Sequence, residues 1–150
     1  MSIYTRTLYH VVFSTAYRKN VLENYNRPEL FKYITGILKN RNCSLLRING
    51  SDDHLHMLIN IPADIPVARV VRDIKNGSTR FIKEKALFPD FRGWESGFCA
   101  FTVSAREKEE VIMYIRNQEE HHRYVAYEDE LRSLLIENEV PHRVGATLVS

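Results

Sequence analysis

Two histidines separated by one residue form the pattern in this sequence that is best suited to chemistry. His54-Leu55-His56 lies in a run where bulky apolar residues alternate with histidine, and a period of two is typical of a β-strand. Side chains at positions i and i+2 of a strand project from the same face, about 7 Å apart along the backbone. Two imidazole nitrogens placed in this way can bind one metal cation. The alternative is a half-exposed strand on which the two histidines share no role.

Tyr114 and Gln118 form a second candidate pair, because a spacing of four residues places both side chains on one face of a helix. A phenol has a pKa of about 10 and is a poor nucleophile at neutral pH. It becomes effective when a metal ion polarises the electrophile and stabilises the charge that develops on it. Two imidazoles and the neutral glutamine oxygen would leave a divalent ion its full charge to act on a phosphate. The alternative for Tyr114 is an aromatic residue that packs its helix against a sheet.

The apolar pattern around these residues predicts alternating strands and helices. Strands are expected over residues 8–14, 44–49, 54–60 and 98–103, with a tight antiparallel hairpin connection at residues 50–53. Helices are expected over residues 28–38, 66–83, 104–122 and 128–137, followed by a tail over residues 141–150. The spacing of Ser104 and Glu107 is that of a capping box, which sets the start of the third helix.

The order of these elements predicts an α+β fold: a ferredoxin-like βαββαβ sandwich with an additional C-terminal helix that carries Tyr114. In this fold the first and third strands lie side by side at the centre of the sheet. We therefore expect His54 and His56 at the middle of the sheet, beside either His10 or Tyr9.

Length and composition indicate a single globular domain. The chain has 150 residues, of which 44% are hydrophobic and 27% are charged. No apolar run has the length of a membrane span, and the first residues contain no apolar signal segment, so we expect a cytoplasmic protein without a membrane partner. Cys43 and Cys99 are isolated and are expected to be small buried apolar residues.

The charge is unevenly distributed along the chain. Residues 1–106 hold 16 Lys and Arg against 9 Asp and Glu, a balance of +7, whereas residues 107–150 hold 5 against 10, a balance of −5. A basic body indicates a polyanionic partner. The candidate contacts are a basic loop and the basic side of the second helix: Arg18, Lys19, Arg69, Arg72 and Arg80. The alternative for that helix is an ordinary solvated face.

Several motifs in this order resemble those of a known family. Asp53-His54-Leu55-His56, followed about 58 residues later by Tyr114-Ile115-Arg116-Asn117-Gln118, resembles the HUH single-tyrosine transposases, the TnpA proteins of short bacterial and archaeal insertion sequences. Residues 9–19 are similar to the opening strand and basic turn of that family, and residues 94–101 to its approach to the fourth strand. The resemblance covers residues 5 to about 125.

The resemblance implies a single-stranded DNA endonuclease and strand transferase that acts at insertion-sequence ends. Tyr114 would form a 5′-phosphotyrosine link, while His54, His56 and Gln118 would bind Mg²⁺ or Mn²⁺. It also implies a homodimer with active sites built in trans, recognition of single-stranded or hairpin DNA, and a place in a prokaryotic cytoplasm at the nucleoid. Residues 1–125 would form the catalytic domain, and residues 126–150 a C-terminal helix and tail of the same domain.

Two other functions use parts of the same pattern. A rolling-circle replication initiator or relaxase-like HUH nuclease would use the same histidine pair, but such proteins usually carry further domains. A non-catalytic ferredoxin-like nucleic-acid-binding module would display stacking aromatic residues on its central strands, where this sequence has histidines.

Other residues of the C-terminal region are weaker candidates. Tyr124 and Tyr127 have no glutamine four residues later, and acidic residues follow Tyr127 directly. His121 and His122 are adjacent, so on a helix they would point apart. We expect these two histidines to be surface residues or minor phosphate contacts.

Overall fold

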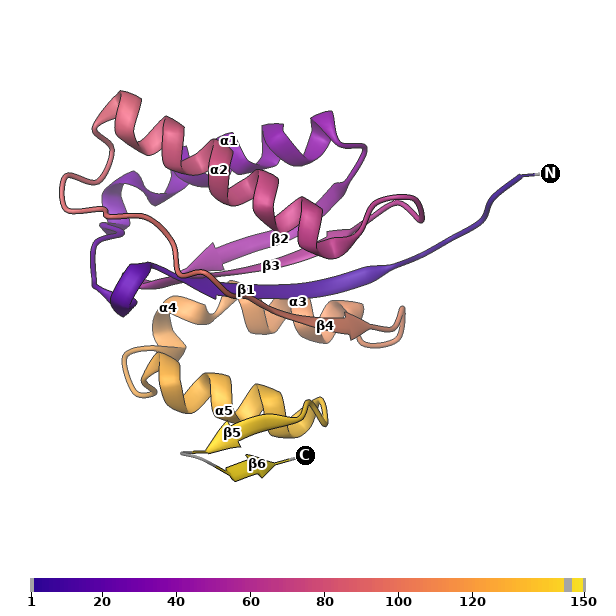
Figure 1. Cartoon of the computed structure of the whole chain (residues 1–150). Helices are drawn as coiled ribbons and strands as arrows, with labels where there is room; N and C mark the ends of the chain where they lie inside the picture. The colour runs from indigo at the N-terminus through magenta and orange to yellow at the C-terminus, as the bar shows by residue number, and fades with distance from the viewer. Residues whose placement is uncertain (1, 145–146, 150) are drawn as a thin grey trace. The chain divides into compact units, whose positions relative to one another are not determined.

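The computed structural model describes residues 2–144 and 147–149, and the chain forms two compact units, residues 1–119 and 120–150 (Figure 1). The first unit holds a four-stranded antiparallel sheet with helices on both faces. The second holds a helix and a short hairpin. Within the described ranges, no helix has the length and apolar character needed to cross a membrane.

The sheet of the first unit has the strand order β2-β3-β1-β4. Its strands are β1 (Leu8–Ser14), β2 (Ser44–Gly50), β3 (His54–Asn60) and β4 (Cys99–Val103). Every neighbouring pair is antiparallel, and β1 and β3 form the centre. This arrangement confirms the predicted ferredoxin-like sandwich. It also shows that His10, and not Tyr9, lies beside the histidines of β3, because His10 projects from the same face of the sheet as His56 and contacts it.

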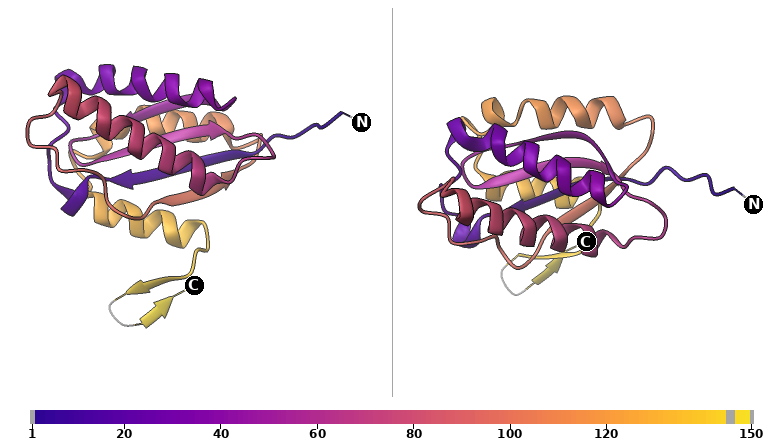
Figure 2. Two further views of the ribbon diagram at one scale, coloured as in Figure 1. Left: turned by 45° about the horizontal axis from the view of Figure 1, so that its top comes forward. Right: turned by 90° about the horizontal axis from the view of Figure 1, so that it is seen from above.

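Helices α1 (Arg27–Asn40) and α2 (Val67–Lys85) cover one face of this sheet (Figures 1 and 2). Pro28 lies in the first turn of α1, where its missing N–H is tolerated. Both helices bury apolar side chains at helical spacing against the sheet, among them Ile34 and Ile74. Complete burial of one such side chain contributes about 1.5–3 kcal/mol to folding.

The opposite face is covered by α3 (Lys108–Arg116), through the contact of Ile115 with Leu8 and Leu58. Ser104 and Glu107 form the expected reciprocal bonds: the backbone and hydroxyl of Ser104 donate to Glu107 Oε1, and the Glu107 backbone donates to Ser104 Oγ. These bonds lower the pKa of the exposed Glu107 carboxyl. The bonds of the predicted capping box are therefore present, but the predicted start is wrong: α3 begins at Lys108, with Glu107 as its N-cap, and residues 105–107 form a turn before it.

The expected end of this helix is also wrong, because it does not continue to about residue 122. Asn117 ends α3 with φ −92° and ψ 13°, and its N–H bonds to Met113 O. A separate single turn, α4 (Gln118–His121), follows. Asparagine favours helix ends because its side chain competes with helical hydrogen bonds.

In the second unit, α5 (Tyr127–Glu137) agrees with the predicted last helix. The expected tail beyond residue 141 is wrong for the residues described there. Strands β5 (His142–Val144) and β6 (Thr147–Val149) pair in an antiparallel hairpin. This stretch contains β-branched residues that favour strands, a signal that outweighs its position near the end of the chain.

Candidate active site

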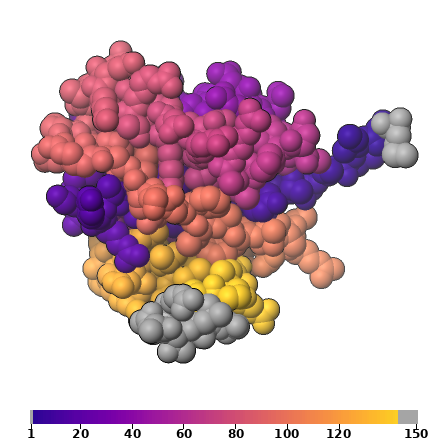
Figure 3. Space-filling model, viewed as in Figure 1, coloured from indigo at the N-terminus to yellow at the C-terminus, as the bar shows by residue number. Residues whose placement is uncertain are grey.

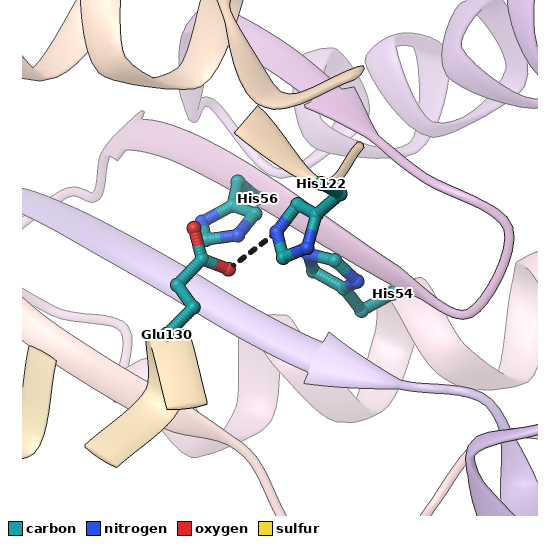
Figure 4. Close-up of side chains that lie close together, drawn as sticks. All are labelled: His54, His56, His122 and Glu130. Carbon is teal, nitrogen blue, oxygen red and sulfur yellow. Dashed lines mark hydrogen bonds and ion pairs between the residues drawn. The ribbon is translucent and has the colours of Figure 1, made fainter. Parts of the chain in front are cut away.

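His54 and His56 lie on β3 (Figure 4). Both side chains are completely buried. Their ring centroids are 5.0 Å apart, and a nitrogen of one ring lies within 4.8 Å of a nitrogen of the other. Both side chains project to the α3 face, whereas Leu55 and Met57 between and beyond them pack on the α1–α2 face. The two histidines therefore form one buried cluster, not the half-exposed strand that was the alternative.

A carboxylate orients the His54 ring. His54 Nδ1 lies 2.7 Å from Asp53 Oδ1, and Ser51 Oγ donates to the same carboxylate oxygen at 3.0 Å. An ionised carboxylate can only accept, so Nδ1 carries the proton and Nε2 carries the lone pair. A carboxylate–histidine pair of this kind is a common support for a metal ligand. The sequence pattern included Asp53 in its motif but did not reveal this role.

A third histidine orients His56. His10 is 4% exposed, and its Nε2 lies 2.8 Å from Nδ1 of His56. When His56 donates through Nδ1, its Nε2 carries the lone pair that a cation requires. His10 was expected only as a neighbour, because its partner lies 46 residues away in the sequence.

Tyr114 lies beside this pair of imidazoles. Its ring centroid is 5.8 Å from that of His56 and 6.0 Å from that of His10, with both rings edge-on. The tyrosine is half-buried on α3, next to the contact of Ile115 with the sheet. It therefore packs its helix against the sheet, as one of the two interpretations expected, while its position beside His56 leaves the nucleophile role as a prediction.

Gln118 is completely buried, with its amide oriented by the backbone. Its Nε2 donates to Tyr114 O at 3.4 Å. Its Oε1 is buried and accepts no hydrogen bond from any residue in the described ranges. Leaving a buried carbonyl unsatisfied costs about 1–3 kcal/mol, which a cation ligated by that oxygen would relieve. The residues present thus fit a divalent ion: two imidazole nitrogens and one amide oxygen.

The two cysteines are not candidates for this chemistry. Burial, together with Glu95, raises the pKa of the Cys99 thiol to about 11, against the opposing effect of Arg18. Burial also raises the pKa of the Cys43 thiol. Both thiols are protonated at neutral pH and are therefore poor nucleophiles and ligands.

The basic loop after β1 lies at the His54 end of the sheet. Arg18 and Lys19 are exposed there, and Tyr17 is 88% exposed. Tyr17 and Arg18 both have positive φ angles, of 59° and 53°. Hydrogen bonds impose this strained shape: Thr15 N donates to Asp53 O, and Thr15 Oγ1 donates to Lys19 O, both at 2.8 Å.

The basic residues of α2 lie elsewhere. Arg69, Arg72 and Arg80 are exposed on α2, which packs on the sheet face opposite to the histidines. The structure therefore brings His54, His56 and Tyr114 together and bonds Gln118 back to Tyr114. It places the basic loop at the His54 end of the sheet and leaves the three α2 arginines on the opposite face.

The expectation that His121 and His122 point apart is wrong. Within the second unit, His122 Nε2 lies 2.8 Å from Glu130 Oε1 (Figure 4), and His121 Nε2 lies 3.4 Å from Glu130 Oε2. Since α4 ends at His121, the helical angle between adjacent residues does not apply to this pair. Both imidazoles therefore face one carboxylate.

Comparison with known proteins gives a consistent result. The model of the family described as "Transposase IS200 like" matches residues 3–118. The transposase for insertion sequence element IS200 from Salmonella typhimurium is 24% identical over 115 residues, covering 73% of this chain and 75% of the relative. The ISDra2 transposase TnpA from Deinococcus radiodurans is also 24% identical over 115 residues, covering 73% of this chain and 82% of the relative.

Two solved structures share the fold. A protein assigned as a transposase in Deinococcus radiodurans R1 aligns with a TM-score of 0.61 and 22% identity, covering 79% of this chain and 95% of its own. A REP-associated tyrosine transposase bound to a REP hairpin aligns with a TM-score of 0.60 and 18% identity, covering 100% of this chain and 96% of its own.

Proposed function

Because this chain belongs to the IS200-like transposase family, we propose that it cuts and rejoins single-stranded DNA through a covalent link between Tyr114 and a 5′-phosphate. The observation that carries this proposal is the position of the Tyr114 ring, 5.8 Å from that of the buried His56. A nucleophile thus lies beside a set of residues suited to binding a cation.

In the proposed reaction, the phenol oxygen of Tyr114 forms a bond to the scissile phosphorus. The bond from phosphorus to the 3′ oxygen breaks, the phenol loses its proton and the 3′ oxygen gains one. A phosphodiester is exchanged for another phosphodiester, so no external energy source is needed. A free 3′-OH can later attack the phosphotyrosine and release Tyr114, which joins two DNA ends.

His54, His56 and Gln118 would hold a divalent ion, Mg²⁺ or Mn²⁺. Such an ion, when bound, neutralises charge on the phosphate oxygens. Asp53 holds the His54 ring in a fixed orientation through His54 Nδ1, and His10 holds the His56 ring through His56 Nδ1. Complete burial of the two ligand histidines limits the access of water to them.

We further propose that the loop at residues 17–19 guides the DNA strand. It offers two cations and one exposed aromatic ring, a combination that binds phosphates and stacks on bases. This part of the chain is the dark indigo segment on the left of the surface in Figure 3. One structural relative is bound to a REP hairpin, which supports hairpin DNA as a substrate here. Arg69, Arg72 and Arg80 on α2 remain candidates for a second DNA contact.

The assembly of the site involves either one chain or two. The homodimer implied by the family resemblance stays a proposal, which light scattering tests. Active sites built in trans would need Tyr114 to serve the histidines of a partner. Within one chain, however, the Tyr114 ring already lies beside the His56 ring. This contact favours a site completed within one chain.

The other two functions receive less support. A non-catalytic binding module does not account for a tyrosine beside two buried histidines, one of which contacts a third. A replication initiator or relaxase would share the chemistry, but the family match favours transposition.

The proposal is tested by incubating the protein with single-stranded DNA from the flanks of its own gene. A covalent band on a denaturing gel is expected when the label is on the 3′ side of the cut, because that fragment keeps the 5′-phosphate. EDTA should abolish the band, Mg²⁺ or Mn²⁺ should restore it, and circular dichroism should stay unchanged. Full activity after exhaustive chelation would refute the metal assignment, and loss of fold on chelation would indicate a structural zinc ion instead.

A further inference from the structure

Arg27, the first residue of α1, is buried yet makes hydrogen bonds to three separate segments. It is 5% exposed. Its Nε donates to Leu22 O at 2.9 Å and its Nη2 to Asp52 Oδ1 at 2.8 Å. Its Nη1 donates to Gly50 O at 3.1 Å and to Glu119 Oε1 at 3.2 Å. A guanidinium is suited to this role, because its donors point in several fixed directions.

Two of these three segments adjoin candidate metal ligands. Gly50 and Asp52 belong to the turn that leads into His54. Glu119 directly follows Gln118. The guanidinium therefore connects the turn before His54 with the residue after Gln118. Its two carboxylate partners, Asp52 and Glu119, are 67 residues apart in the sequence.

The segment around Gln118 needs such an anchor. The α3 helix ends at Arg116, and α4 is a single turn of four residues, which has little stability of its own. On the other side of Gln118, Asn49 Nδ2 donates to Arg116 O at 2.9 Å. Asn49 lies opposite His56 in the β2–β3 pair. Two side-chain contacts therefore flank Gln118. Asn49 of β2 bonds to the residue two positions before it, and Arg27 of α1, which also bonds to the β2–β3 turn, bonds to the residue after it.

We propose that Arg27 is a positioning residue, which holds Gln118 in register with His54 through its bond to Glu119. This inference rests on the proposed metal-dependent function and adds the residues that assemble its ligand set. Arg27 itself would bind neither the DNA nor the ion. It acts by fixing the distance between His54, which lies on β3, and Gln118, which follows the end of α3.

Because Glu119 is exposed, its effect on the position of Gln118 can be measured apart from any effect on the stability of the fold. Its side chain is 52% exposed, and the Asp52 side chain is 59% exposed. Ion pairs with an exposed partner add little to folding. Loss of the Glu119 carboxylate should therefore leave the fold intact and affect the placement of Gln118.

The test is a titration of the full-length protein with Mn²⁺ alone, with free Mn²⁺ measured by electron paramagnetic resonance. Glu119→Ala removes the one acceptor of Arg27 that adjoins Gln118, whereas Glu119→Gln keeps an oxygen in the same place. Glu120→Ala is the matched control, because Glu120 is the exposed residue next along the chain.

Glu119→Ala should weaken Mn²⁺ binding by about tenfold, the lower end of the usual effect of a supporting residue. Glu119→Gln and Glu120→Ala should bind like the wild type, and melting temperatures should agree within about 2 °C. DNA cleavage by Glu119→Ala should recover at saturating Mn²⁺. Unchanged Mn²⁺ affinity in Glu119→Ala, with the wild type binding normally, would overturn the positioning role alone. A wild type that binds no Mn²⁺ would instead refute the metal site, and the positioning role with it.

Arg27→Lys provides a second measurement. Lysine keeps the charge but cannot reproduce bonds in these separate directions. It should lower Mn²⁺ affinity, and adding Glu119→Ala should then cause no further loss, because both changes remove the same link. Additive losses would show that Glu119 acts independently of Arg27.

Discussion

His10 Nε2 lies 2.8 Å from His56 Nδ1, and this contact between two buried imidazoles sets which ring nitrogen of His56 remains for a cation. A hydrogen bond between two rings needs one N–H and one lone pair. When His56 donates, His10 must present an unprotonated Nε2. The relationship makes His10 part of the candidate site, although it contacts the cation position only through His56.

Removal of the His10 acceptor should weaken cation binding. His10→Phe keeps a planar ring but leaves His56 Nδ1 without this partner. We expect Mn²⁺ affinity to fall by about 10- to 100-fold, as for other residues that support metal ligands. His10→Gln supplies an amide oxygen as acceptor and should lose less. Equal affinities of both variants and the wild type, measured by calorimetric titration, would contradict this role.

Tyr114→Phe should abolish the covalent protein–DNA band and DNA cleavage together. The change removes the nucleophilic oxygen and almost no volume, so the free energy of unfolding should change by no more than about 1 kcal/mol. DNA binding, measured by fluorescence anisotropy, should be preserved. Tyr124, which is 84% exposed, offers the control, since Tyr124→Phe should keep both activities. A band that persists in Tyr114→Phe would identify another nucleophile.

A mixture of two inactive variants should show which chain supplies the tyrosine. The His54→Ala chain lacks a ligand and the Tyr114→Phe chain lacks the nucleophile. Since Tyr114 lies beside His56 of its own chain, we expect the mixture to stay inactive at every ratio. Restored cleavage would instead demonstrate a dimer with sites built in trans. Light scattering on the same samples gives the oligomeric state needed to interpret the result.

Gly50→Ala should disturb the turn that leads into His54. A Cβ at Gly50 would lie 2.3 Å from His54 O and 2.9 Å from Leu55 Cδ2, so the backbone must shift. We expect a destabilisation of about 1–3 kcal/mol in urea unfolding, together with weaker Mn²⁺ binding. Gly36 in α1 is the control, because a Cβ there meets no described atom within 4 Å. Gly36→Ala should stabilise the protein by about 0.5–1 kcal/mol. Equal stability of Gly50→Ala and the wild type would show that the turn can relax.

Replacement of the basic loop should weaken binding of a short single-stranded oligonucleotide. Alanine at Arg18 and Lys19 removes two cations beside the His54 end of the sheet. The slope of log K against log salt should fall by about 0.7 for each phosphate that the variant no longer neutralises.

Alanine at Arg69, Arg72 and Arg80 provides the comparison, because these residues lie on the opposite face. This triple variant should reduce binding of the short oligonucleotide less than the loop variant does. The reverse order would place the DNA path over α2.

The amino-acid sequence alone determined the arrangement of the histidine strand and its neighbours. A period of two places His54 and His56 on one face, because alternation along a strand is a local property of the backbone. Gly50 and the following polar residues close the hairpin locally, and the spacing of Ser104 and Glu107 predicts the reciprocal bonds that these two residues form just before the third helix. The spacing of four residues also predicted that Tyr114 and Gln118 lie close together. They do, since Gln118 Nε2 donates to Tyr114 O despite the break at Asn117.

Only the tertiary structure decided which distant side chains meet. The contact of His10 with His56 depends on the register between β1 and β3, and the bonds of Arg27 depend on how α1 is placed over the β2–β3 turn. The remote position of the α2 arginines follows from which face of the sheet each helix covers. These outcomes arise from packing between segments far apart in sequence, whereas periodicity and spacing report interactions between near neighbours.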